Sequence, residues 1–370
     1  MIKHLSPYET DASQLVGKAT KVIQPKTIQE LKIAVKENPK ICIRGGGTGL
    51  AGGAVPQNEI VLDLSKLDKI ENLDTSRKTI DVEAGVILDD LNNYLDKYNL
   101  EFPLNPSSHA ICTIGGMIAT NAVGSRAIKY GRTSEWVNYL EIINSMGEIE
   151  SKSKTELSDY AGMEGITGVI AKASLRLSAK RSQRTATLIS SGYINEISDY
   201  VRNLKRNPNV SMIEFFDKKI SEWLGLSFKY HLLVEFESEE GNLKGEDYKK
   251  IMETRDKLYP TLAEKGYNRI EDPKILLDRF DKLFATIESY DIPTYGHLSV
   301  GILHPCFSKS QERLIPEIMS LTKKLSGQIT GEHGIGILKK EFVEVTDKKL
   351  IQLIKSRTDP TNKFNSGKVL

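Results

Sequence analysis

The sequence predicts a protein of the α+β class, with a ligand-binding part followed by an antiparallel αβ part. Three observations lead to this prediction. The glycine-rich residues 44–53 join two predicted strands and not a strand and a helix. Lysine and glutamate become frequent after Ser178. A chain of 370 residues is also long enough for two domains with separate cores.

The glycine-rich segment is typical of a phosphate-binding loop. Glycine tolerates positive φ, so consecutive glycines let several backbone N–H groups converge on one anion. The part from Gly47 to Gly52 also matches the dinucleotide fingerprint GxGxxG, which requires a helix beginning at its last glycine. Here Pro56 follows closely, and the next element is the strand-like run 60–64. The context therefore excludes a Rossmann fold and leaves a phosphate loop between two strands.

The other elements follow from hydrophobic periodicity and end signals. Thr27 and Glu30 form a capping box that predicts the start of the first helix. In the first part we expect strands at residues 22–23, 41–43, 80–84, 139–143 and 173–177, and helices at residues 28–38 and 88–98. In the second part we expect strands at residues 187–190, 212–216 and 231–236, and helices at residues 194–204 and 247–258, the latter stopped by Pro260.

Two more segments are rich in small residues. Residues 102–125 contain few large side chains, which fits either a loop with a tightly packed helix or a backbone surface that lies close to a flat ligand. Residues 162–170 form a third glycine-rich loop that leads into the strand at 173–177.

Charge and composition exclude several classes of function. Lysine and arginine number 51 against 49 acidic residues, so the net charge of +2 implies no general attraction to nucleic acid or anionic lipid. Three cysteines without a repeated spacing predict neither a disulfide framework nor a zinc finger. We find no signal sequence and no long apolar run, and we expect a soluble, cytoplasmic protein without a transmembrane segment.

Histidines are concentrated near the C-terminal end. Three of the six lie in residues 296–304 and 331–336, together with Glu332. Imidazole and carboxylate groups are the usual ligands of divalent transition metals. His297 and His304 are seven residues apart and would face opposite ways on one straight strand, so we expect a turn or bulge at Gly301 to bring them together. The alternative is three unrelated histidines at strand ends.

Residues 44–56, 103–133 and 162–177 closely resemble the flavin domain of the vanillyl-alcohol-oxidase-type (PCMH-type) FAD family. The chain is most similar to the group of D-lactate dehydrogenases and glycolate oxidase FAD subunits, and the resemblance extends from Tyr8 to Lys368. It implies a two-subdomain FAD-binding domain at residues 1–179, a cap domain at 180–325 that is shorter than usual, and a C-terminal segment at 326–370 that packs on the FAD domain.

The resemblance implies bound FAD. The first loop would hold the pyrophosphate, the second segment would lie along the flavin, and the third loop would contact the adenosine side. The residues that we expect to bind FAD are Arg44, Gly45, Gly46, Gly47, Thr48, Gly49, Gly52, Pro106, Ser107, Ser108, Thr113, Gly115, Gly116, Ala119, Thr120, Asn121, Gly124, Glu164, Gly165, Gly168, Ile170 and Asn365. We expect non-covalent binding, because relatives with tethered flavin often have histidine where this chain has Thr48.

The resemblance also implies a metal centre. In the family, the residues that correspond to His297, His304 and Glu332 hold one divalent metal, here expected to be zinc, manganese or iron. The residue that corresponds to His333 is the general base. The chain departs from the family motif between the two histidines, where Ser299, Val300 and Ile302 replace a glycine, an aspartate and an asparagine. From this loss of polar groups we expect a weakened or altered metal affinity.

The implied activity is FAD-dependent oxidation of a D-2-hydroxy acid, such as D-lactate or glycolate, to the 2-oxo acid, with hydride transfer to the flavin. Arg279 would either clamp the substrate carboxylate or be a solvated helix arginine. The sequence does not choose the electron acceptor among an iron-sulfur protein, an electron-transfer protein and a quinone. It does not choose between a monomer and a homodimer either. Two alternatives are a flavin subunit that only relays electrons and a non-redox transferase like the alkylglycerone-phosphate synthases, which have a His-His-His run where this chain has residues 331–334.

Four further residues have structural explanations. We interpret His109 as structural and His231 as a residue of a sheet surface. Cys42 and Cys306 act most simply as small hydrophobic residues.

Overall fold

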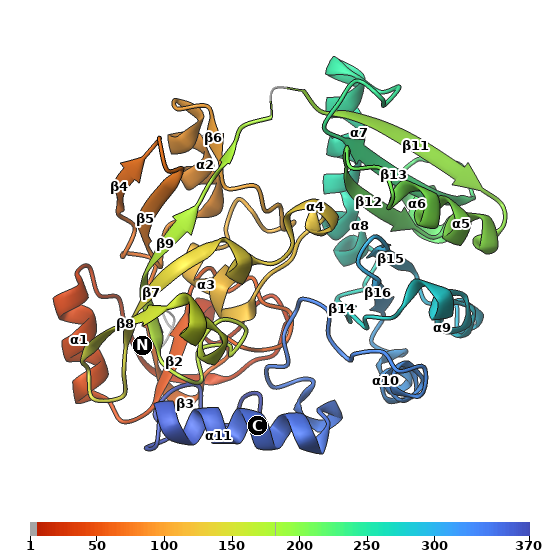
Figure 1. Ribbon diagram of the computed structural model, residues 1–370. Helices are drawn as coiled ribbons and strands as arrows, with labels where there is room; N and C mark the ends of the chain where they lie inside the picture. Colours follow the sequence, from red (N-terminus) through yellow and green to blue (C-terminus); the bar gives the residue numbers. More distant parts are fainter. Residues whose placement is uncertain (1–5, 182) are drawn as a thin grey trace. The chain divides into compact units, whose positions relative to one another are not determined.

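The computed structural model describes residues 6–181 and 183–370, which form two compact units (Figure 1). Unit 1 contains the chain up to Ala122, residues 132–180 and residues 332–370. Unit 2 contains residues 123–131 and 181–331. Helix and strand both occur in each unit, which confirms the α+β class. None of the helices in the described parts of the chain combines the length and apolar character needed to span a membrane.

Unit 1 is built around two sheets. Its strands are β1 (Lys18–Ile23), β2 (Ile41–Arg44), β3 (Gln57–Asp63), β4 (Ile70–Asp74), β5 (Thr79–Glu83), β6 (Leu100–Glu101), β7 (Val137–Ile143), β8 (Ile149–Ser153), β9 (Val169–Arg176) and β10 (Ser178–Ala179). Its helices are α1 (Ile28–Glu37), α2 (Leu88–Asp96), α3 (Ile114–Thr120) and α11 (Val345–Thr358), with short 3₁₀ turns η1 (Ser6–Tyr8), η2 (Thr133–Trp136), η3 (Lys154–Asp159) and η5 (Lys340–Phe342).

The glycine-rich loop joins two neighbouring strands of unit 1. Strands β1, β3 and β2 form a parallel sheet in that order, and the loop runs from the end of β2 to the start of β3. This confirms the strand–loop–strand prediction. A second sheet has the antiparallel order β4-β5-β9-β7-β8, and β6 pairs with β10.

The C-terminal residues of unit 1 are hydrogen-bonded to the parallel sheet that contains the glycine-rich loop. Residues after α11 pair with β2, since Ile41 N donates to the carbonyl of Lys363 and Asn365 N donates to the carbonyl of Ile41. Buried lysines add further bonds: Lys363 Nζ donates to the carbonyl of Val35, and Lys368 Nζ donates to the carbonyl of Gly53. The end of the chain is therefore part of the scaffold of the loop.

Unit 2 is one antiparallel sheet with helices around it. Its strands, in the spatial order of the sheet, are β11 (Thr185–Ser191), β13 (Tyr230–Phe236), β12 (Val210–Phe216), β15 (Thr294–His297), β16 (Ile302–Phe307) and β14 (Arg269–Ile270). Its helices are α4 (Ala127–Tyr130), α5 (Ile194–Leu204), α6 (Lys218–Trp223), α7 (Gly245–Asp256), α8 (Leu258–Glu264), α9 (Leu277–Ser289) and α10 (Ile315–Lys324), with the 3₁₀ turn η4 (Glu312–Leu314).

Helices α7 and α9 cover opposite faces of this sheet. Neighbouring residues of a strand point to opposite faces. On β12, Phe215 contacts the rings of Phe280 and Phe284 from α9, whereas the adjacent Glu214 pairs with Arg255 from α7. The α9 face carries the apolar core, and the α7 face carries a buried charge pair.

Two predictions about unit 2 were wrong. Pro260 does not stop the helix before it: α7 ends at Asp256, and Pro260 lies in the first turn of α8, where proline is tolerated. His231 is not on a sheet surface. It is buried within β13, and its ring nitrogens lie within hydrogen-bond distance of the hydroxyls of Ser221 and Ser227.

A buried ion pair joins α4 to the sheet of unit 2. Arg126 donates two hydrogen bonds to the carboxylate of Glu235 on β13, which also accepts bonds from Ser211 and Tyr248. Burial of Glu235 alone would raise its pKa, but the charge of Arg126 outweighs this and lowers the pKa to about 2. The pair therefore stabilises the folded state wherever Glu235 is ionised.

We predict that Glu235→Gln lowers the free energy of unfolding by about 3 kcal/mol at pH 7, because the folded pKa lies about 2.5 units below the ordinary value of 4.5. A depressed pKa gives stability that is complete above the unfolded pKa and is lost as the pH falls. The difference from the parent protein should shrink to about half at pH 3. Urea unfolding followed by circular dichroism measures both values. Glu246→Gln, which removes an exposed carboxylate of α7, is the control. Equal effects of the two substitutions would contradict the prediction.

Candidate functional site

His297 and His304 lie on the two strands of one hairpin. His297 ends β15, His304 is the third residue of β16, and residues 298–301 form the turn between them. Gly301 has a φ of 76°, and an added Cβ there would come within 2.1 Å of the carbonyl oxygen of Ile275. The turn thus requires glycine at this position, as the sequence predicts.

The hairpin puts both imidazoles on the same face of the sheet. His297 pairs with Ile302 and Tyr295 pairs with His304, so the alternation of side chains turns His297, Tyr295 and His304 to one side. The ring of Tyr295 stacks on that of His304 at a centroid distance of 4.5 Å. The two histidine rings are 5.2 Å apart, and both side chains are buried. Packing therefore fixes the orientation of both rings.

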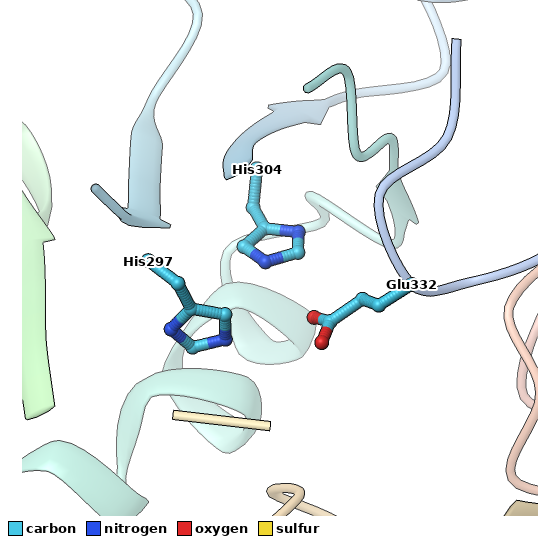
Figure 2. A group of neighbouring side chains, drawn as sticks. All are labelled: His297, His304 and Glu332. Atoms are coloured by element: carbon cyan, nitrogen blue, oxygen red, sulfur yellow. The ribbon is translucent and has the colours of Figure 1, made fainter. Parts of the chain in front are cut away.

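Glu332 follows a residue that is held within unit 2. Gly331 belongs to unit 2, and its backbone N–H donates to the carboxylate of Asp272, which follows β14 by two residues. An added Cβ at Gly331 would come within 2.6 Å of Ile302. Ligand atoms of His297, His304 and Glu332 lie within 4.8 Å of one another, and Figure 2 shows both rings and the carboxylate turned toward a common point.

This donor set fits a divalent transition metal. Two imidazoles and one carboxylate are ligands that zinc, manganese and iron accept, and three protein ligands leave coordination positions open for another molecule. His297 and His304 are almost fully buried, and the Glu332 side chain is 13% exposed. Among the described residues, this is the one group of at least three such side chains whose ligand atoms converge.

The residues after Glu332 are held by an acidic side chain of unit 1. The backbone N–H groups of Ile335 and Gly336 donate to the two carboxylate oxygens of Glu164 at 2.6 and 2.8 Å. His333 lies between these bonds and Glu332, and its Nε2 atom is 3.7 Å from a Glu332 carboxylate oxygen. The base predicted from the sequence therefore lies beside the predicted ligand.

The turn between the histidines is apolar in its surroundings. Val300 and Ile302 pack with Val123 and Ala127 in one hydrophobic cluster. Ser299 is buried, and its hydroxyl has no hydrogen-bond partner within the described ranges. The residues that replace the polar groups of the family motif thus fill space and do not orient the imidazoles by hydrogen bonds.

In unit 1, the first glycine loop packs directly on the second predicted segment. An added Cβ at Gly45 would come within 2.4 Å of the Thr113 hydroxyl, and one at Gly46 would come within 2.3 Å of the carbonyl oxygen of Ile111. Thr113 is also the N-cap of α3, where its side chain accepts a bond from Gly116 N. Small residues are therefore required where these two segments meet.

The third loop completes the arrangement. Glu164 N donates to the carbonyl of Ala119, and Gly162 N donates to the carbonyl of Ile118, so the third loop lies against α3. Gly49 differs from the glycines before it, because an added Cβ there would have no atom within 4 Å. An open position on a loop whose neighbours are tightly packed is what a ligand that approaches the backbone needs. The three loops fit the phosphate and ring of FAD.

Several predicted FAD-binding side chains have partners within the protein. Both carboxylate oxygens of Glu164 accept backbone bonds, and its carbonyl accepts a bond from the Asn365 amide. Arg44 donates to the carbonyl of Thr10. The side-chain amide oxygen of Asn121 accepts from Ser134 N. These side chains shape the loops, while the backbone remains the part that can face a cofactor.

The structure also gives the surroundings of three other residues that the sequence analysis singled out. Gly124 belongs to unit 2, whereas the other predicted FAD residues belong to unit 1. Arg279 donates to the carbonyl of Leu325 at the end of α10, so it would have to give up this bond to hold a substrate. A ring nitrogen of His109 is 2.8 Å from the carboxylate of Asp89, in agreement with the structural interpretation.

Sequence reasoning missed three residues around the candidate metal ligands. Glu214 lies within the apolar run of β12, and a lone carboxylate in such a run is a usable signal. Its partner Arg255 lies on α7, where nothing distinguishes it from the other charged residues of that helix. Asp272 gives no signal, because its role depends on a backbone N–H donated from residue 331.

Comparison with known proteins agrees with these observations. The family model of the FAD binding domain matches residues 19–152, and that of the C-terminal domain of FAD linked oxidases matches residues 243–369. The D-lactate dehydrogenase of Archaeoglobus fulgidus is 30% identical, over 94% of this chain and 91% of that protein. The glycolate oxidase subunit GlcD of Bacillus subtilis is 28% identical over 98% and 91%, and the D-2-hydroxyglutarate dehydrogenase of Xanthomonas citri pv. viticola is 26% identical over 93% and 88%. This chain therefore belongs to the PCMH-type family of FAD-dependent oxidoreductases.

Proposed function

We propose that this chain is a dehydrogenase that uses FAD to oxidise a D-2-hydroxy acid, such as D-lactate, glycolate or a similar acid, to the 2-oxo acid. The observation that carries the proposal is the convergence of His297, His304 and Glu332 in a chain of this family. The names of its relatives support the substrate class, because they are a D-lactate dehydrogenase, a glycolate oxidase subunit and a D-2-hydroxyglutarate dehydrogenase.

FAD, when bound, supplies the acceptor for the hydride that leaves the carbinol carbon. The loops at residues 45–53, 106–121 and 162–168 would hold it through their backbone N–H groups and close packing. Binding would be non-covalent. Burial raises the pKa of the Cys112 thiol to about 11, so this cysteine of the second loop is protonated near neutral pH and is a poor nucleophile toward a flavin.

A divalent ion, when bound to His297, His304 and Glu332, supplies positive charge that lowers the pKa of a coordinated hydroxyl. The three ligands leave positions for the hydroxyl and carboxylate oxygens of a 2-hydroxy acid, which would orient the substrate. The donor set is compatible with zinc, manganese or iron.

His333 would accept the hydroxyl proton as general base. An imidazole has an ordinary pKa near working pH, which suits it to this task. Gly331 and Gly334 flank the pair of functional residues, and Gly334 has a φ of 81° that favours glycine. This backbone freedom lets Glu332 turn to the metal while His333 turns to the substrate.

The relay subunit remains the second candidate, because one observation favours it. Val300 and Ile302 surround the turn between the histidines with apolar packing where the family motif is polar. A chain that only relays electrons would not need to orient a substrate there. Reduction of its own flavin by a hydroxy acid separates the two functions. The transferase alternative predicts no flavin reduction either.

We predict that Gly49→Val folds like the parent protein and binds FAD at least about tenfold more weakly, because the new side chain fills the open space above the loop. The measurement is FAD retained by the purified protein and released into the supernatant by acid precipitation. Gly192→Val is the matched control, because this glycine also has no atom within 4 Å of an added Cβ but lies in unit 2. Equal FAD content in both variants would refute a ligand position at Gly49.

We predict that His333→Ala keeps FAD and metal but reduces its flavin about 10²- to 10⁴-fold more slowly, because the substrate hydroxyl loses its general base. Anaerobic rapid mixing with the D and L forms of lactate and 2-hydroxyglutarate, and with glycolate, measures flavin bleaching without the electron acceptor. His231→Ala, which removes another buried imidazole, is the control. If none of these acids bleaches the flavin of the parent protein, the proposed function is wrong. An unchanged rate in His333→Ala would contradict only the assignment of His333 as general base.

A further inference from the structure

Glu214 is the cross-strand neighbour of His297. The β12–β15 ladder pairs Phe216 with Tyr295 and Phe215 with Gly296, so its next step places Glu214 opposite His297. Cross-strand neighbours lie on the same face of a sheet. Glu214 Oε1 is accordingly 3.9 Å from His297 Nδ1. Both side chains are buried in unit 2.

The Glu214 carboxylate is fixed from its other side. Its Oε2 atom accepts a hydrogen bond of 2.8 Å from Arg255 Nε, and the Arg255 side chain is only 5% exposed. A terminal nitrogen of the Arg255 guanidinium also donates to Asp256. Burial alone would lower the pKa of Arg255, and the Glu214 charge beside it raises that pKa overall, so the guanidinium stays charged. Glu214 Oε1 accepts no hydrogen bond from any part of the chain that the structure describes.

The two nitrogens of His297 face different groups. Nδ1 is the atom near Glu214, and in Figure 2 the nitrogen remote from Cβ is the one turned toward Glu332. A neutral imidazole carries a proton on one nitrogen and a lone pair on the other. If the proton is on Nδ1, the lone pair of Nε2 is directed to the point where His304 and Glu332 converge.

We propose that Glu214 is a positioning residue for His297. Its Oε1 accepts a hydrogen bond from Nδ1–H, which requires the two atoms to approach by about 1 Å, and this bond holds the tautomer in which Nε2 is the metal ligand. The hydrogen bond from Arg255 holds the carboxylate in place. The proposal rests on the metal site of the proposed function. It assigns to unit 2 an orienting group that the turn at residues 298–301 does not provide.

The first test measures metal affinity directly. The FAD-loaded protein is stripped with a chelator and titrated with Co²⁺ or Zn²⁺ in competition with a chromophoric chelator. Glu214→Gln should weaken binding about 10- to 100-fold, which is the usual effect of removing such a partner. The matched control is Glu235→Gln, because Glu235 is also buried in this sheet and also paired with an arginine, Arg126. Equal metal affinity in the two variants would overturn the proposal.

A second variant removes the carboxylate without leaving a buried unpaired charge. Glu214→Leu with Arg255→Met replaces the ion pair by apolar side chains, an exchange that proteins often tolerate. This double variant should show the same loss of metal affinity. Full affinity in a folded double variant would overturn the proposal even if the single variants do not fold.

The second test does not need the metal. Selective ¹⁵N labelling of the six histidines gives imidazole spectra in which protonated and unprotonated nitrogens differ. In the metal-free parent protein, His297 should be protonated at Nδ1, and the Glu214→Leu/Arg255→Met variant should lose this preference. If the parent protein binds no metal, the proposed metal site is wrong. The tautomer of His297 would still show whether Glu214 orients this imidazole. An Nε2–H tautomer in the parent, or no change in the variant, would overturn the proposal.

Discussion

The candidate site depends on residues 330–336 being held by buried acidic side chains at both ends. Asp272 of unit 2 accepts the backbone N–H of Gly331, and Glu164 of unit 1 accepts those of the two residues after Gly334. Each bond to a carboxylate is charge-assisted and therefore stronger than an ordinary backbone bond. Glu332 and His333 lie between these two attachments. The chemistry proposed for them thus relies on residues that are neither ligand nor base.

The sequence predicted the parts of this arrangement that residue type and spacing can reveal. The glycine loop was recognisable because it is followed by a strand, and His297 and His304 were recognisable as candidate ligands that need a turn between them. The contributions of Asp272 and Glu214 were not predicted, because they arise from a backbone bond over 59 residues and from strand pairing over 83 residues. Periodicity describes single elements and carries no information about such partners. Pro260 illustrates the same limit of sequence reasoning, because a helix accepts proline only in its first turn and the sequence did not reveal that a new helix begins at Leu258.

Metal sites usually have a second layer of hydrogen bonds that orients the ligands. In this chain the turn between the histidines is apolar, with Val300 and Ile302 in a hydrophobic cluster. Orientation comes instead from the sheet: Tyr295 stacks on His304, and Glu214 lies beside His297 on the adjacent strand. The departure from the family motif is therefore compatible with a metal centre that is positioned by strand neighbours.

The metal content of the purified protein tests the central claim most directly. Elemental analysis of the FAD-loaded protein should find one divalent metal per chain in the parent and in His231→Ala, which removes a buried histidine of β13. His304→Ala should lose the metal and keep its FAD, because the predicted FAD loops and the hairpin are built from different segments. A full complement of metal in His304→Ala would contradict the account, as would a parent protein that retains no metal when it is purified and reconstituted with zinc, manganese and iron.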